Sequence, residues 1–426
     1  MAALAALLIP ADAGAQTFGQ ILDSEIPLDV STATPAGVLD RPRPELQPPP
    51  LRLGGLAVAA SLDAALGSTS NVLGAQSQRE ADGFAEWQPQ LVAALDPGPD
   101  RSLQATLGYD GKRFFDTPAK RQDGHFIGAS GDYGFGLGGL LFATAYQQRI
   151  YEDQLAGTYP AGGGGAVAID QAHVQARLSQ AVNRLKLTGA ATYDRLLYHA
   201  TVTTTGLLLP QSYRDDTVLR ASSRIDYTLL ANTALFAQLS WRRTRYSDAS
   251  TYADRSSREW RAIAGYSGGV TGLIRISGGI GGYWRDYDPA SIGPRFGTVS
   301  GLAWDLHAIY AVTTLTTLSL QTKREYVDAN VSQSPGYVAS SLRVELDHEF
   351  LRQLLLSVSF GDEADRFRFI QRQDRMRDFA MSAEYWISPH LLVKPRMEWL
   401  ERDSSGADAG PRIPEFRSQL ALSVRN

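Results

Sequence analysis

The chain has 426 residues, 43% of them hydrophobic, and its 41 basic and 45 acidic residues leave a net charge of only −4. This balance argues against a nucleic-acid-binding surface. No apolar run approaches the roughly 18 residues of a membrane-spanning helix. The absence of cysteine suits an oxidising compartment.

The first 52 residues differ in composition from the rest. Residues 1–15, MAALAALLIPADAGA, have the apolar region and the small-residue cleavage site of a signal peptide but no basic n-region, and are interpreted as an incomplete signal peptide. Residues 16–52 include the proline-rich run DRPRPELQPPP, which disfavours helix and sheet and predicts an extended periplasmic lead-in. This lead-in could thread into a barrel and restrict it, but the favoured interpretation is a solvated tail.

Residues 53–426 repeat one pattern, which is clearest between Tyr310 and Leu354. Apolar and polar residues alternate from Thr316 to Glu325, and again from Val338 to Phe350 after a polar stretch at 328–336. Strict alternation indicates β-strands with one apolar and one wet face. Similar segments are predicted at 54–66, 82–96, 102–115, 123–134, 138–152, 170–182, 185–198, 214–229, 233–247, 257–269, 272–286, 298–311, 315–327, 337–350, 354–366, 376–387, 391–402 and 415–425.

The connections between these segments alternate between short turns and long polar loops. Short turns next to Asn183 and Ser388 contrast with long loops such as 153–169 and 199–213. Outer-membrane barrels are built this way, with an even number of strands. The sequence therefore predicts an all-β fold, a transmembrane antiparallel up-and-down β-barrel of about 18 strands with short periplasmic turns and long extracellular loops. Loops such as 153–169 and 199–213 are candidates to fold inward.

The apolar faces end in aromatic residues, as expected where a barrel meets the membrane interface. The residues concerned are Tyr227, Trp241, Trp260, Trp284, Tyr310, Phe350, Tyr385 and Trp399.

The opposite faces predict a charged lumen, in which both signs occur. Rings of charge in such a lumen select the ions or sugars that pass. Structural pairing that stiffens the interior is the alternative, and Tyr283 is the candidate for stacking on a sugar. The predicted channel-lining residues are Arg220, Arg224, Arg242, Arg261, Arg275, Tyr283, Asp305, Lys323, Arg343, Glu345, Asp347, Arg396 and Glu398.

The sequence offers little for catalysis or for cofactors. The six histidines are scattered without metal-ligand spacing. Asp305 and His307 would share one strand face, but such polar neighbours are commonplace. The glycine runs at 134–139 and 162–165 lack the context of a nucleotide site. No catalytic, cofactor-binding or metal residue is therefore predicted, and the expectation is a protein that is not an enzyme.

The first hairpin, SLDAALGSTSNVL at 61–73 with DGFAEWQPQL at 82–91, and the run from Leu302 to Phe350 resemble the "putative beta-barrel porin" family of proteobacterial outer-membrane proteins, often encoded with exopolysaccharide genes. The resemblance covers residues 52–426 and implies a pore-like barrel in the outer membrane. One departure is the C-terminus, Leu422-Ser-Val-Arg-Asn426, because barrels of this kind usually end on an aromatic residue that assists assembly.

The expected function is porin-like passage of small hydrophilic solutes or of an exported polysaccharide, with both termini in the periplasm. The alternative is a non-conducting scaffold barrel of an exopolysaccharide export machine. Expected partners are outer-membrane lipid and lipopolysaccharide, the barrel-assembly machinery and, for the export function, polysaccharide export proteins, with no nucleic acid.

Overall fold

The computed structural model describes residues 37–426 except 99, 161, 231, 248–253, 290–294 and 332. The predicted signal peptide (1–15) and the first part of the predicted lead-in (16–36) lie outside the described residues. Among the described residues, no helix is long and apolar enough to cross a membrane.

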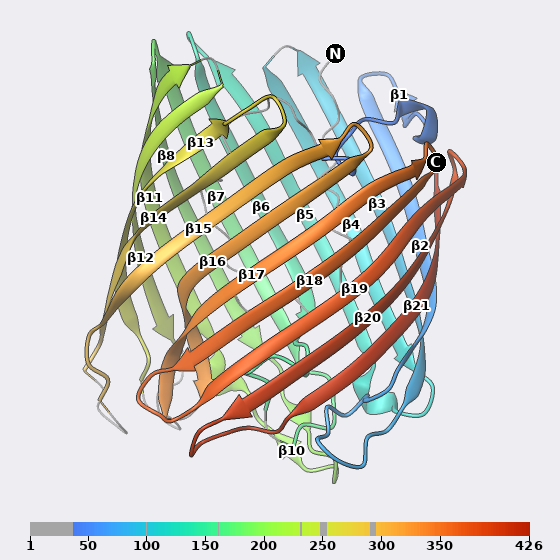
Figure 1. Cartoon of the computed structure of the whole chain (residues 1–426), viewed down its shortest axis with the longest axis vertical. Helices are drawn as coiled ribbons and strands as arrows, with labels where there is room; N and C mark the ends of the chain where they lie inside the picture. Colours follow the sequence, from blue (N-terminus) through green and yellow to red (C-terminus); the bar gives the residue numbers. More distant parts are fainter. Residues whose placement is uncertain are drawn as a thin grey trace.

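Eighteen long antiparallel strands, among the described residues, close into a barrel because β2 pairs with β21 from Ser61↔Arg425 to Thr69↔Arg417 (Figure 1). Closure removes the exposed strand edges that an open sheet would have. The wall strands are β2 (Leu56–Thr69), β3 (Asp82–Gly98), β4 (Arg101–Phe114), β5 (Gln122–Phe135), β6 (Gly139–Tyr151), β7 (Ala168–Val182), β8 (Leu185–Tyr198), β11 (Asp216–Leu230), β12 (Thr233–Tyr246), β13 (Ser257–Gly269), β14 (Ile274–Tyr287), β15 (Val299–Thr313), β16 (Thr316–Val331), β17 (Ser334–Leu351), β18 (Leu354–Phe367), β19 (Gln373–Ser388), β20 (Leu391–Ser405) and β21 (Ile413–Arg425).

Smaller elements decorate the wall. They are the strands β1 (Leu51–Leu53), which pairs with β2, and β9 (Thr201–Val202) and β10 (Leu208–Leu209), which pair with each other, and the 3-10 turns η1 (Pro44–Leu46), η2 (Pro118–Lys120) and η3 (Ser212–Arg214).

The predicted fold is confirmed, and the strand boundaries agree closely. The strands at 185–198 and 257–269 begin and end where the alternation does. The polar loop predicted at 328–336 is wrong, because β16 continues to Val331 and β17 begins at Ser334.

The two ends of the barrel differ, and we name them after their connections. At the turn end, strands are joined by short links such as 183–184, 314–315 and 352–353, and the C-terminus lies at this end (Figure 1). At the loop end, longer links such as 152–167 and 199–215 join the strands.

The outer face of the wall is apolar and exposed, as a lipid-facing surface requires. Leu185 and Leu187 on β8 are 43% and 55% exposed, whereas Thr188, one position away, is 7% exposed. The same alternation runs along the other strands. Because successive side chains of a strand point to opposite faces, the residues next to an outward apolar side chain face the lumen.

Glycines on β13–β15 allow a close approach of strands that larger residues would prevent. A Cβ atom at Gly281 would overlap the carbonyl oxygen of Ala262 on the neighbouring strand.

We expect Gly281→Val to destabilise the barrel by about 1–3 kcal/mol or more, because the added side chain would collide with a backbone atom that cannot move aside. The measurement is the temperature at which folded protein loses its compact mobility on a denaturing gel. Gly189→Val is the matched control, because nothing lies within 4 Å of its Cβ position; equal losses in both variants would contradict this explanation.

Candidate solute pathway through the barrel

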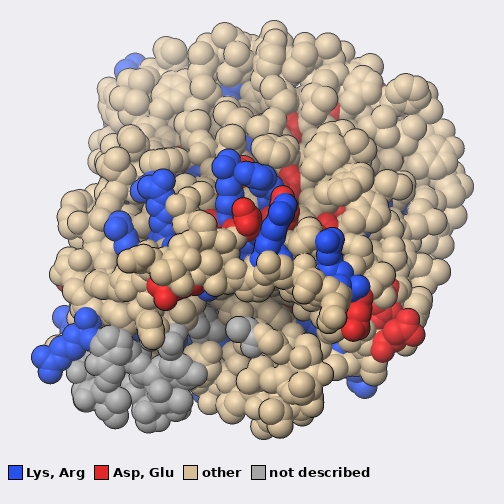
Figure 2. Space-filling view, turned by 60° about the horizontal axis from the view of Figure 1, so that its bottom comes forward, with Lys and Arg blue, Asp and Glu red and all other residues tan. Residues whose placement is uncertain are grey.

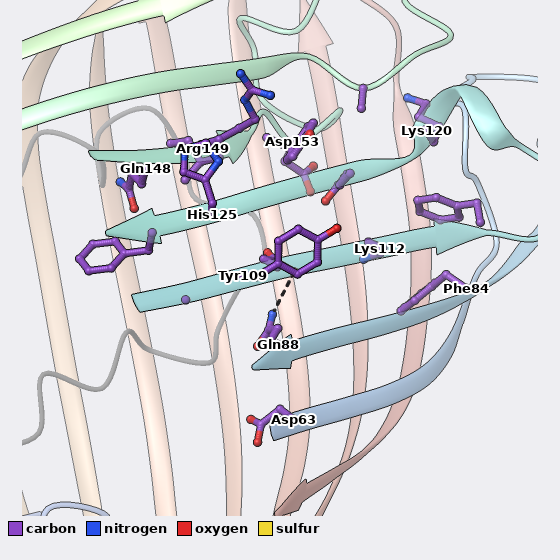
Figure 3. A pocket seen from close by; sticks show the side chains of 18 of the residues that line it. Asp63, Phe84, Gln88, Tyr109, Lys112, Lys120, His125, Gln148, Arg149 and Asp153 are labelled. Atoms are coloured by element: carbon purple, nitrogen blue, oxygen red, sulfur yellow. Dashed lines mark hydrogen bonds between the residues drawn. The ribbon is translucent and has the colours of Figure 1, made fainter. Parts of the chain in front are cut away.

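A cavity of about 390 Å³ runs along the inner wall formed by β2–β6, β20 and β21 (Figure 3). Its lining reaches from Arg425, next to the turn end, to Lys120 and Gln154 at the loop end. Asp63, Gln88 and Lys112 line it between these limits. The cavity therefore follows the barrel axis.

The cavity wall carries charges of both signs that are largely paired with each other. Lys394 lies 2.5 Å from Asp63, and Lys112 lies 3.5 Å from Glu86. Arg417 contacts Glu415 at 2.6 Å and Asp153 at 2.9 Å. Such alternation of sign leaves no strong field that would draw in one kind of ion.

An aromatic patch interrupts this charged wall. The rings of Phe84 and Phe114 are 5.6 Å apart, and the Lys112 ammonium lies 4.0 Å from the centre of the Phe84 ring. The contact is of the cation–π type. Phe84 is only 2% exposed, so this contact packs the wall and leaves no free Phe84 ring face for a solute.

The loop at 152–167 crosses the loop end of the lumen. It connects β6 to β7, yet its backbone is held from the other side of the barrel. Arg402 of β20 donates to the carbonyl oxygens of Leu155 and Ala156 at 3.3 and 2.8 Å, and Arg372 donates to that of Gly157 at 3.2 Å. Leu155 is only 5% exposed. This loop therefore folds inward, as the sequence analysis considered for residues 153–169.

The loop at 199–215 lies against the loop at 152–167. Gly163 and Thr203 form an isolated β-bridge, and the Gly164 amide donates to the Val202 carbonyl at 2.8 Å. Arg214 lies 2.8 Å from Glu152, with both side chains almost fully buried. The two loops therefore form one cover over the loop end.

The loop-end half of the β16–β17 hairpin also folds inward. The pairing of β15 with β16 stops at Trp304↔Arg324, although both strands continue. Beyond that point Tyr326 packs with Tyr283 on the inner wall, with ring centres 5.7 Å apart. Asp328 forms ion pairs with Arg242 at 2.5 Å and with Arg285. The buried carboxylate is therefore stabilised by cations from two other strands.

Lys120 lies where the cavity meets the cover. Its ammonium donates to the Tyr159 hydroxyl at 2.9 Å and to the Gln154 side chain at 3.2 Å. Burial lowers the pKa of Lys120 from its usual 10.5 to about 8, although nearby Asp153 and Glu415 oppose the shift. The positive charge is therefore present at pH 7 and largely lost at pH 9.

We expect the pathway to become more cation-selective between pH 7 and pH 9, because loss of the Lys120 charge leaves its acidic neighbours in excess. The measurement is the reversal potential across a bilayer under a salt gradient. In Lys120→Met, the shift of this potential with pH should be smaller than in the original protein. An identical shift in both proteins would rule out Lys120 as a source of the pH dependence.

At the turn end, residues 37–47 enter the lumen. Val38 is fully buried, and its amide donates to the Thr317 hydroxyl at 3.0 Å. Arg43 is 3% exposed and lies 2.9 Å from Glu349. For these residues the predicted solvated tail is wrong, because the run that contains them carries a buried arginine with a buried partner.

The predicted channel-lining residues all lie on strands whose parity turns them inward. Several are paired: Arg220 with Asp194 at 2.8 Å, Arg396 with Glu398 at 3.1 Å, and Arg343 with Asp378 at 3.3 Å. Tyr283 is 2% exposed in a hydrophobic cluster, which leaves no free ring face for a sugar. Their role in a channel stays a prediction, since none of them lines the cavity. The residues placed on this face are Arg220, Arg224, Arg242, Arg261, Arg275, Tyr283, Asp305, Lys323, Arg343, Glu345, Asp347, Arg396 and Glu398.

The cavity residues that the sequence missed come mainly from the first strands. Asp63, Phe84, Gln88 and Lys112 alternate with outward residues as the later lumenal residues do, so the same pattern could have identified them. Lys120 and Gln154 lie in loops and carry no such signal.

Two solved structures illustrate what the chain is similar to. The outer membrane protein OpdK from Pseudomonas aeruginosa shares 10% identity, with 87% of this chain and 98% of that chain covered and a TM-score of 0.45. The siderophore receptor PirA from Acinetobacter baumannii shares 9% identity, with 87% and 80% covered and a TM-score of 0.48.

A search of curated proteins found no match. A family model matches residues 146–421, which is more than half of the chain. The matched range includes the strands from β7 to β20 and most of β21. A closed barrel with an apolar outer band is the form in which proteins span the outer membrane. The chain is an outer-membrane porin-like β-barrel and belongs to the family described as "Putative beta-barrel porin 2".

Proposed function

We propose that the barrel carries small, uncharged or zwitterionic hydrophilic solutes across the outer membrane, with the turn end and both termini in the periplasm. The observation that supports this most is the cavity along β2–β6, which follows the barrel axis and is lined by paired charges and the Phe84–Phe114 patch. Paired charges supply hydrogen-bonding groups without selecting one sign of ion.

Both ends of the lumen are narrowed, which suggests gated rather than free passage. The loop cover lies over the loop end, and residues 37–47 lie inside the turn end against β16 and β17. A polymer in transit would have to displace both at once. Small solutes therefore fit the observations better than an exported polysaccharide.

A liposome-swelling assay tests the proposal. Vesicles containing the refolded barrel should swell faster in isosmotic monosaccharide than in a longer oligosaccharide, because the cavity is small. Swelling at the rate of protein-free vesicles for every sugar would reject it.

The second candidate is a non-conducting scaffold barrel for an exopolysaccharide export machine. The narrowing at both ends favours it, because a purely structural barrel needs no passage. If deletion of residues 16–50 abolishes polymer export while bilayer conductance stays unchanged, the scaffold is the better account.

A further inference from the structure

An aromatic row lies on the outer face of β18–β21, where the apolar band meets the loop end. Phe360 pairs in register with Phe379, Phe379 with Trp399, and Trp399 with Phe416. The ring centres of Trp399 and its two neighbours are 5.7 and 4.9 Å away. Four adjacent strands thus present their aromatic residues at one height.

Below this row the wall is apolar. Met381, Met397 and Leu420 are 45%, 51% and 57% exposed on the outer face of β19, β20 and β21. Figure 2 shows a broad wall with few charges and a band of mixed charges gathered at the loop end. The aromatic row therefore separates a surface for acyl chains from a charged rim.

Arginines lie on the loop-end side of the row. Arg377 and Arg79 line an outward-opening hollow of about 400 Å³ together with Phe379, Trp399 and Phe416. The Arg377 side chain is 48% exposed and approaches Asp362 only at 3.5 Å, because Asp362 is held by Arg375 at 2.7 and 3.0 Å. Three carboxylates line the hollow, and each is engaged by an arginine that does not line it: Glu401 by Arg412, Glu415 by Arg417 and Asp378 by Arg343. Arg377 therefore keeps donors available to a ligand.

We propose that this hollow binds a phosphate of a phosphorylated glycolipid of the outer leaflet, with Arg377 and Arg79 on the phosphate and the acyl chains along the apolar wall below. Guanidinium groups match phosphate oxygens with paired hydrogen bonds. Aromatic rings at the interface fix the depth of the head group. The inference rests on the proposed orientation, in which the loop end faces outward.

The test is binding of diphosphorylated lipid A to the full-length barrel in neutral detergent, followed by the rise in unfolding temperature with lipid concentration. The double variant Arg79→Gln/Arg377→Gln should bind roughly tenfold more weakly, since it loses charge-assisted hydrogen bonds. Arg245→Gln is the matched control, because Arg245 is an exposed loop-end arginine on the distant strand β12.

Lipid A without phosphate and a phosphatidylglycerol form two further arms. Equal binding of dephosphorylated lipid A would overturn the phosphate contact, and equal binding of phosphatidylglycerol would overturn the choice of a glycolipid. Equal weakening by Arg245→Gln would overturn the site itself. Because binding in detergent needs neither conductance nor a membrane orientation, its failure is distinguishable from failure of the proposed function.

Discussion

Removing residues 16–50 should raise the single-channel conductance severalfold. The reason is that residues 37–47 occupy the turn end of the lumen, where Val38 is bound to Thr317 and Arg43 to Glu349. The measurement is planar-bilayer recording of the refolded deletion variant beside the full-length protein. An unchanged conductance would mean that this segment does not limit the pathway.

A point variant tests whether the Arg43–Glu349 ion pair holds residues 37–47 inside the lumen. Glu349→Gln removes the partner of a buried arginine, and leaving such a charge unpaired typically costs about 3–5 kcal/mol. We expect this loss to release the segment and to raise conductance toward that of the deletion variant. Glu45→Gln is the matched control, because the Glu45–Arg352 pair is about half exposed and contributes little. Equal conductance changes in the two variants would contradict the role of Glu349 in holding the segment inside the lumen.

Replacing residues 154–165 by a short glycine–serine linker should also raise conductance severalfold and should admit larger sugars. The replaced segment spans the loop end and is held by Arg402 of β20 and by Arg372 in the loop between β18 and β19. Bilayer recordings with oligosaccharides of graded size as blockers measure the effect. A wider pathway shows as block by larger sugars.

The control for this replacement is a shortened loop at 406–412, which is mostly exposed at the rim of the barrel. Its shortening should leave conductance within the scatter of the original protein. If both replacements act alike, the effect comes from general loosening of the loop end. If neither acts, the loop at 152–167 does not narrow the pathway.

The wall of the barrel was predictable from sequence because the pattern of each strand depends only on what its own two faces contact. A strand with lipid on one side and water on the other must alternate, so the ends of the strand at 185–198 can be found from its own sequence. The lumenal faces followed from the same parity, which is why the predicted residues such as Arg220 and Arg396 face inward.

The obstructions inside the barrel were not predictable in the same way. The β16–β17 hairpin buries both of its faces beyond Arg324, so alternation ends there and Asp328 resembles a loop residue. Its carboxylate is satisfied by Arg242 and Arg285, which lie far away in sequence. Likewise, the proline-rich composition around Arg43 gives no sign of its partner Glu349. These features depend on ion pairs between residues that are far apart in the sequence, and such pairs cannot be predicted from local composition.

The proposed function requires that water and solutes pass along the cavity lined by β2–β6. Because the chain contains no cysteine, a single introduced thiol can report on one position. Gln88 lines the cavity, whereas Leu91 on the same strand faces outward and is 41% exposed. In the variant without residues 16–50, a bulky charged thiol reagent should reduce the single-channel current through Gln88→Cys and leave that through Leu91→Cys unchanged. An unaltered current after complete modification of Gln88→Cys would contradict passage along this cavity.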